Sequence, residues 1–305
     1  MKLTERTAFI YTGNQPFGPI IIKTRAPTLI PRPETEDWTI RLASLLEDRF
    51  PVKDGGERTT VLRMLDLCTG TGCIPILLSH LRRQAGGITV AYGVDISTDA
   101  VSLAWENATD QSLTPSSGLN CIVPHDDDPE ASAEVVGTGE FDGRTNRSRG
   151  RVGLNAASAA NGGGRSALVM MHADILREEF VQVVHSRMEP PFDVITSNPP
   201  YIPLDEYEGL PNSVKEWEDQ RALLGDPPAD GSGDCSEGRG LMFYHRIAQI
   251  VSADGVLASN GVVALEVGHT QAEWVRGILA GTGRVSATEV WKDPWGVPRV
   301  VVGYR

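Results

Sequence analysis

The chain has 305 residues, of which 40% are hydrophobic, enough for one large domain or two modest ones. Its formal net charge of −12 argues against binding to the phosphate backbone of nucleic acids. No apolar run approaches the roughly 20 residues that a membrane span needs, so no transmembrane helix is expected. The four cysteines, Cys68, Cys73, Cys121 and Cys235, show neither a CxxC pair nor zinc-ligand spacing, which predicts reduced thiols and no metal site.

The first fifty residues predict a small β element followed by a linker helix. "GPIIIKT" is apolar and β-branched, as strands are. In "PRPETEDWTIRLASLLEDRF", Pro33 stands near a helix start and acidic residues fill the first turn, where the helix dipole favours them. Trp38, Leu42 and Leu46 then recur at helical spacing. We therefore assign residues 1–50 to an N-terminal element.

From residue 61 onward, strand and helix patterns alternate. The strand patterns are "VLRMLDL", "TVAYGVD", "ALVMMHAD", "FDVITSN" and "GVVALEVG", with helical patterns of about a dozen residues between them. This alternation predicts an α/β catalytic domain over residues 51–305, built on a doubly wound parallel sheet. "ATEVWK" and "PRVVVGY" lie close together near the C-terminus, which predicts a terminal β-hairpin.

Two segments interrupt the alternation. Residues 109–166 are rich in Gly, Ser, Asn and Asp, and such a stretch buries too little apolar surface to offset its ordering entropy, so we expect a disordered insertion. Its "HDDDPE" is expected to be solvated charge and not a metal cluster. Residues 226–239 predict a second, shorter insertion.

A glycine turn after the first strand predicts a ligand site. In "LDLCTGTGCIPIL", Gly70 and Gly72 let the backbone pass close to a ligand at a helix start. The NAD fingerprint would require a third glycine where Pro75 stands, and no phosphate-binding G-x-x-x-x-G-K-[ST] is present. Asp66, just before the turn, suits a ligand with a cationic end.

Acidic residues also end the next two strands. Asp95 is placed to hold the two hydroxyls of a ribose. Asp174 could accept from an exocyclic amine, and Ile175 could flank a flat base. Any one of these acids alone is more commonly a helix N-cap. Together with the glycine turn they favour a nucleoside that carries a positive centre, a description that S-adenosylmethionine fits.

The segment "SNPPYIP" follows the strand "FDVIT". Proline has a fixed φ and no N–H, and it keeps the preceding residue out of the α region, so Asn198 and Pro199 are held extended. A plain Asn-Pro turn is one interpretation. The position just past a strand end, where open α/β sheets place their ligands, favours a functional one.

The order of "LIPRPETE", "LDLCTGTG", "GVDIS", "SNPPYIP", "ALLGDPP", "GLMFYHRI" and "KDPWGVPRVVVG" resembles the HemK/PrmC family of protein-(glutamine-N5) methyltransferases. These enzymes methylate the glutamine of the Gly-Gly-Gln motif in peptide-chain release factors, a part of translation termination. The resemblance implies a class I S-adenosylmethionine-dependent methyltransferase fold with a seven-stranded sheet. It implies a cofactor site lined by Cys68, Thr69, Gly70, Thr71, Gly72, Asp95, Ile175 and Asn198. It implies that Asn198, Pro199, Pro200 and Tyr201 hold the glutamine.

The side-chain oxygen of Asn198 and the carbonyl of Pro199 are suited to accept the two N–H bonds of a glutamine amide. The nitrogens of Pro199 and Pro200 cannot donate competing hydrogen bonds, and the Tyr201 ring would pack on the amide plane. "PRPETE" is expected to pack beside this site; its alternative role is that of a scaffold helix alone.

The sequence departs from the family in two places. Only about a dozen residues precede "GNQPFG", so we expect the family's N-terminal helical domain to be largely absent. The family's Glu-Pro before an Ala-Leu pair appears here as "EDQRALL". N-P-P-Y is shared with adenine-N6 nucleic-acid methyltransferases, which are the second interpretation, and a degenerate cofactor-binding module is the third. We expect a monomer whose partner is a release factor. We also expect a mitochondrial location, with the cytoplasm as the alternative, because eukaryotic relatives with "PRPETE" resemble the mitochondrial branch.

Overall fold

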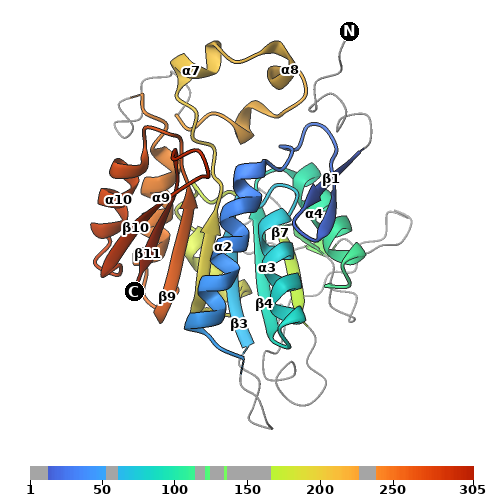
Figure 1. Ribbon diagram of the computed structural model, residues 1–305, viewed down its shortest axis with the longest axis vertical. Coiled ribbons are helices and arrows are strands. Elements are labelled where there is room, and N and C mark those ends of the chain that lie inside the picture. Colours follow the sequence, from blue (N-terminus) through green and yellow to red (C-terminus); the bar gives the residue numbers. More distant parts are fainter. Residues whose placement is uncertain (1–12, 53–60, 114–120, 124–133, 136–165, 227–237) are drawn as a thin grey trace.

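The computed structural model describes residues 13–52, 61–113, 121–123, 134–135, 166–226 and 238–305. The described residues form a central mixed β-sheet, and helices cover both of its faces (Figure 1). Its centre consists of five parallel strands, β3 (Val61–Leu67), β4 (Ile88–Asp95), β7 (Ala167–His172), β8 (Phe192–Ser197) and β9 (Leu257–Glu266). These strands are buried along most of their length, as expected of a parallel sheet covered on both sides.

The terminal hairpin completes a seven-stranded core. Strands β10 (Ala287–Lys292) and β11 (Pro298–Tyr304) pair antiparallel, and β11 also pairs antiparallel with β9. The seven strands lie in the spatial order β10-β11-β9-β8-β3-β4-β7. This arrangement confirms the predicted class I methyltransferase fold and its hairpin.

Two short strands extend the sheet from within the segment expected to be a disordered insertion. β5 (Cys121–Val123) pairs parallel with β7, and β6 (Glu134–Val135) pairs antiparallel with β5. Leu113, also inside that segment, is fully buried. The expectation of disorder over the whole of residues 109–166 is therefore wrong at these positions. Most of the rest of the segment, including "HDDDPE", lies outside the described residues, as does most of the second insertion.

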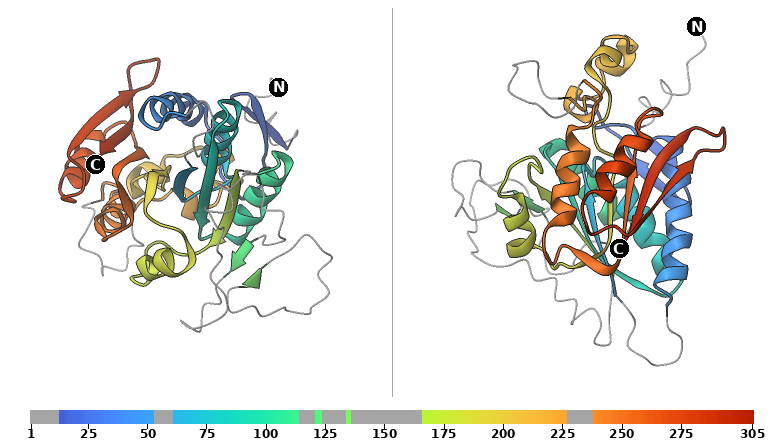
Figure 2. Two further views of the ribbon diagram at one scale, coloured as in Figure 1. Left: turned by 90° about the horizontal axis from the view of Figure 1, so that it is seen from below. Right: turned by 90° about the vertical axis from the view of Figure 1, so that its left-hand side faces the viewer.

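The helices divide between the two faces of the sheet (Figure 2). One face carries α2 (Pro33–Arg49), α3 (Cys73–Gln84) and α4 (Thr98–Asp110); the other carries α6 (Phe180–Arg187), α9 (Met242–Ser252) and α10 (Ala272–Ala280). None of the helices in the described ranges is both long and apolar enough to cross a membrane. The sheet and its two helical layers form the doubly wound architecture that the alternating sequence predicts.

Helix α2 belongs to the same core as the catalytic domain. Pro33 occupies its first turn, where a missing N–H costs nothing, and Trp38, Leu42 and Leu46 form its buried face. These side chains join one hydrophobic cluster with residues of α3 and β3. The boundary predicted near residue 50 thus does not separate two hydrophobic cores, because residues on both sides of it belong to one cluster.

The N-terminal β element is a hairpin that packs against the same layer. Its strands are β1 (Asn14–Phe17) and β2 (Ile20–Lys23), and the side chains of Phe17, Ile20 and Ile22 are buried in the cluster that contains α2. Asn107 of α4 fastens the hairpin: its Oδ1 accepts from Lys23 N–H at 2.8 Å and its Nδ2 donates to the Lys23 carbonyl at 3.1 Å.

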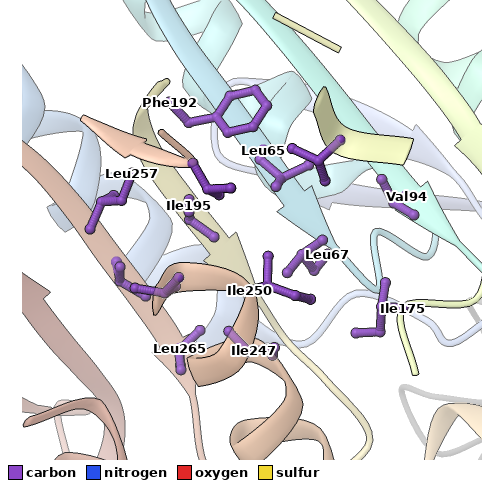
Figure 3. Close-up of a cluster of buried hydrophobic side chains, with 14 of the residues drawn as sticks. Leu65, Leu67, Val94, Ile175, Phe192, Ile195, Ile247, Ile250, Leu257 and Leu265 are labelled. Carbon is purple, nitrogen blue, oxygen red and sulfur yellow. The ribbon is translucent and has the colours of Figure 1, made fainter. Parts of the chain in front are cut away.

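The opposite core cluster lies between the central strands and α9 (Figure 3). Leu65 and Leu67 of β3 pack with Ile195 of β8 and with Ile247 and Ile250 of α9, and all five side chains are fully buried. Complete burial of each such side chain contributes about 1.5–3 kcal/mol. This packing holds the ends of β3 and β8 side by side, where the candidate site begins.

A group of short helices lies beyond the carboxyl ends of the strands (Figure 1). It comprises α7 (Leu204–Glu208), α8 (Asn212–Lys215) and the 3₁₀ turn η1 (Gln220–Ala222). The segment follows β8 directly, so it forms one wall of the region where the strands end.

Candidate active site

The candidate site lies where the chain reverses its direction across the sheet. From β3 the chain proceeds to β4 and β7 on one side and then returns to β8 and β9 on the other. β3 and β8 are neighbours, with Leu67 opposite Ser197. The glycine turn after β3 and the "NPPY" segment after β8 therefore start side by side, at the switch point where open α/β sheets bind ligands.

The glycine turn adopts a tight, left-handed backbone. Gly72 has a φ of +77°, and a Cβ built on it would lie 3.0 Å from Ile76 Cδ1 and from Met170 Cε, so only glycine fits there without displacement. Cys68 and Gly70 also have positive φ. The side chains of Thr69 and Thr71 are buried, so both residues offer a ligand chiefly their backbone.

Asp95 connects the end of β4 to the glycine turn. One of its carboxylate oxygens accepts from Gly70 N–H at 2.8 Å and the other from Ser97 N–H at 2.9 Å. The N-cap of α4 is Ser97, whose hydroxyl accepts from Ala100 N–H, so Asp95 is not a helix cap. Burial raises the pKa of Asp95, and the two backbone hydrogen bonds act in the opposite direction. This partly exposed carboxylate keeps lone pairs for ligand hydroxyls.

The structure corrects the expectation for Asp66. Its side chain is fully buried, and its two oxygens accept from the hydroxyls of Thr69 and Thr196 at 2.6 Å each. Burial raises the pKa of this carboxyl to about 7, although the two hydroxyls favour the ionised form. Asp66 therefore supports the glycine turn from beneath and does not present its carboxylate to the surface.

Replacing Asp66 with asparagine is expected to flatten the pH dependence of stability. Because the folded-state pKa is about 7 and unfolded aspartate titrates near 4, the stabilising effect of protonation is complete below about pH 4 and is lost as the pH rises to about 7. The loss reaches about 1.4 kcal/mol per pH unit. Thermal unfolding of the wild type and of Asp66→Asn between about pH 4 and pH 7 measures this loss. If the free energies of unfolding of the two proteins differed by the same amount at every pH, the assignment would be contradicted.

The predicted base-binding pair is placed differently from expectation. Asp174 accepts from Leu176 N–H at 2.9 Å and is partly exposed, but the Ile175 side chain is 4% exposed and packs into the core cluster of Figure 3. Ile96, next to Asp95, is 42% exposed and its carbonyl lies 2.8 Å from His172 Nε2. Ile96 offers an apolar surface for a flat base that sequence reasoning missed; the signal was an isoleucine directly after the strand-end acid.

Hydrogen bonds fix the backbone of the "NPPY" segment. Pro199 and Pro200 are buried, while Asn198 and Tyr201 are partly buried. The Tyr201 carbonyl accepts from Gln271 Nε2 at 2.8 Å. Ile202 N–H donates to the Leu223 carbonyl at 2.9 Å, and the Ile202 carbonyl accepts from Gly225 N–H at 3.0 Å. Hydrogen bonds with Gln271 and with the backbone of Leu223 and Gly225 thus hold the segment rigid.

Gly240 explains why "GLMFYHRI" belongs to the site. A Cβ at this position would lie 2.1 Å from the Tyr201 carbonyl oxygen, and the residue has a φ of +67°, so no other residue fits against the segment. Gly240 N–H donates to Asp226 Oδ1 at 2.6 Å, and Asp226 Oδ2 accepts from Leu204 N–H at 3.2 Å. Asp226 therefore joins the two ends of the second insertion next to Tyr201.

The start of α2 contacts the same segment. Asn198 Nδ2 lies 3.4 Å from Thr35 Oγ1, and Thr35 Oγ1 donates to Glu266 Oε2 at 2.7 Å. Trp38 Nε1 donates to the same carboxylate oxygen at 2.7 Å. Burial raises the pKa of Glu266, while these two donors act in the opposite direction. The contact confirms that "PRPETE" packs beside the predicted site.

A cavity of about 170 Å³ opens beside Asn198. Its lining includes Pro199, Tyr201 and Arg32, together with apolar residues of the segment that carries α7 and α8. Arg32 Nη2 donates to Glu218 Oε1 at 2.7 Å, and Glu218 is only 6% exposed. Glu218 is the acid of "EDQRALL", and its hydrogen bond with Arg32 ties this wall to the start of α2.

The chain is similar to bacterial proteins named release factor glutamine methyltransferase. It is 28% identical over 286 residues to that of Thermodesulfovibrio yellowstonii, covering 94% of this chain and 72% of the relative. It is 28% identical over 273 residues to that of Bacillus anthracis, covering 90% and 67%. It is 30% identical over 293 residues to that of Rhodospirillum rubrum, covering 96% and 63%.

The crystal structure of a protein-(glutamine-N5) methyltransferase (release factor-specific) from Alicyclobacillus acidocaldarius aligns with 90% of this chain and 94% of its own, at 21% identity and a TM-score of 0.39. No protein-family model matches the chain. The similarity to release factor glutamine methyltransferases thus extends in sequence over nearly the whole chain.

Proposed function

We propose that this protein is an S-adenosylmethionine-dependent methyltransferase that acts on the side-chain amide nitrogen of the glutamine in the Gly-Gly-Gln motif of a peptide-chain release factor. The observation that carries the proposal is the cavity beside Asn198, Pro199 and Tyr201, in the segment that follows β8, the neighbour of the strand that ends at the glycine turn. The names of the sequence relatives support the same reaction.

The residues at the ends of β3 and β4 fit the proposed cofactor. Asp95 offers carboxylate oxygens for the ribose hydroxyls, Ile96 offers an exposed apolar surface for the adenine, and the turn at Gly70 and Gly72 leaves room for close backbone approach. When bound, S-adenosylmethionine supplies a methyl group on a positively charged sulfur, which makes that carbon strongly electrophilic. Asp174, which is partly exposed just past the end of β7, can accept from the adenine amine.

The substrate amide needs orientation more than deprotonation. Its nitrogen is a poor nucleophile because its lone pair is delocalised into the carbonyl. Asn198 Oδ1 and the Pro199 carbonyl can accept its two N–H bonds, which turns the nitrogen toward the methyl group and increases its electron density. The amide proton is released after transfer, so no general base is required. Catalysis then consists of placement and a preorganised polar environment.

Methyl transfer to a Gly-Gly-Gln peptide and to the intact release factor tests the proposal. We expect a mass increase of one methyl group on the glutamine, dependent on S-adenosylmethionine, and none on a matched Gly-Gly-Asn peptide. Adenine-containing oligonucleotides test the second candidate activity, which the net charge of −12 disfavours. Cofactor binding without transfer to any of these substrates would favour a degenerate module.

We further propose that the protein acts as a monomer in the mitochondrion. The charge of the chain and the resemblance of its "PRPETE" element to the mitochondrial branch support these assignments. Sedimentation of the purified protein tests the first, and fractionation of cells that express it tests the second. A dimer in solution, or recovery in the cytosolic fraction alone, would overturn the corresponding assignment.

A further inference from the structure

The donor and the acceptor of each hydrogen bond around Thr35 follow from the chemistry of the groups involved. An indole N–H only donates, so Glu266 Oε2 must accept from Trp38 Nε1 at 2.7 Å. Thr35 Oγ1 lies 2.7 Å from the same oxygen, and it carries the proton of that contact. Since a hydroxyl has one proton, the Thr35 oxygen can only accept from any further partner.

Asn198 is that further partner. Its amide can present either its NH₂ group or its oxygen to Thr35, because the two ends have nearly the same shape. With the Thr35 proton committed to Glu266, an Asn198 oxygen on this side would face another acceptor. Only Nδ2 can make a favourable contact, at 3.4 Å, and Asn198 Oδ1 then points away from Thr35.

We propose that Thr35, anchored by Glu266 and Trp38, is a positioning residue that selects one of the two orientations of the Asn198 amide. The selected orientation leaves Oδ1 free to accept from the substrate amide; the opposite one would direct an NH₂ group at the NH₂ of the substrate. The proposal rests on the proposed function for its consequence in turnover, but the orientation itself is a property of the protein alone.

The part of the arrangement that anchors Thr35 is buried, which strengthens its hydrogen bonds. Thr35 is 1% exposed and Glu266 is 2% exposed, so water does not compete for their hydrogen bonds. Thr35 lies in the first turn of α2, and Arg32, just before that helix, is held by Glu218. The proposal gives the threonine of "PRPETE" a specific task in the site.

The test compares Thr35→Val with Thr35→Ser and with a matched control, Thr39→Val. Thr39 lies one turn further along α2, is fully buried, and donates to the Thr35 carbonyl at 2.6 Å without contacting the site. Both valine variants lose one buried hydroxyl and keep the side-chain shape.

We expect Thr35→Val to lower kcat about 5- to 10-fold, the scale of one hydrogen bond, with the KM for S-adenosylmethionine unchanged. Thr35→Ser keeps the hydroxyl and its hydrogen bonds, so its kcat should stay within about twofold of wild type.

Nuclear magnetic resonance of the wild-type protein reads the orientation without any substrate. We expect nuclear Overhauser effects from the Asn198 side-chain NH₂ protons to the methyl group of Thr35, and a shift of those NH₂ signals in Thr35→Val but not in Thr39→Val. Absence of the Overhauser contact in the wild type would overturn the proposal, even if Thr35→Val does not fold. Equal kcat in the two valine variants would overturn it as well. A wild type with the contact but no methyl transfer would instead refute the proposed function.

Discussion

Replacing Asn198 with alanine is expected to lower turnover on the Gly-Gly-Gln glutamine by roughly 10²-fold or more, by analogy with the removal of one preorganised polar group from an enzyme site. The variant loses the oxygen that orients the substrate amide. The fold should persist, because Pro199 and Pro200 still restrict the backbone and Gln271 still holds the Tyr201 carbonyl. The measurement is the rate of methylation of the peptide at saturating cofactor.

Asn198→Asp is the sharper comparison. Aspartate keeps the size and an acceptor oxygen, but its charge stabilises the cationic ground state more than the transition state, in which that charge disperses. It also places an oxygen against Thr35, where the wild-type Nδ2 lies 3.4 Å from Oγ1. We expect the aspartate variant to bind cofactor at least as well as the alanine variant and to turn over well below wild type. Wild-type turnover by Asn198→Ala would refute the mechanism.

Replacing Asp95 with alanine is expected to weaken S-adenosylmethionine binding by about 1.5–3 kcal/mol, the scale of hydrogen bonds to a charged group. Two effects combine here. The ribose hydroxyls lose their acceptor, and the N–H groups of Gly70 and Ser97 lose theirs, so the glycine turn is no longer tied to the end of β4. Calorimetric titration of the purified variant measures the change.

Asp99→Ala provides the control for the loss of a nearby charge. Asp99 lies exposed in the first turn of α4, four residues beyond Asp95. Its removal should leave the cofactor Kd nearly unchanged, whereas Asp95→Asn, which keeps one acceptor oxygen, should lie between Asp95→Ala and wild type. Equal affinity of Asp95→Ala and Asp99→Ala would remove Asp95 from the site.

The sequence predicts the fold well because the strand and helix periods alternate clearly from residue 61. It also predicts the strand-end position of Asp95, since the carboxyl ends of parallel strands share one edge of a sheet. The same rule applies to Glu266, which ends β9 and lies at the same edge of the sheet. That glutamate could have been found from the strand pattern alone.

Other features of the site depend on contacts that no local pattern encodes. Asp66 is buried because the hydroxyl of Thr196, 130 residues away, satisfies one of its oxygens. Ile175 packs inward because α9 and β3 leave it an apolar space, and the exposed apolar position falls to Ile96 instead. Thr35 lies within "PRPETE", but its partner Glu266 follows only from the packing of α2 against β9. Tertiary packing decides these assignments.

The link between Thr35 and Glu266 joins residues 231 positions apart in the chain. A ribosome adds about 5–20 residues per second, so roughly 10–50 s pass between the synthesis of these two side chains. During that interval α2 has no partner for the hydroxyl of Thr35 and the indole of Trp38. The site is therefore assembled only after β9 has been synthesised, and a nascent or truncated chain that ends before β9 has no means of fixing the asparagine amide.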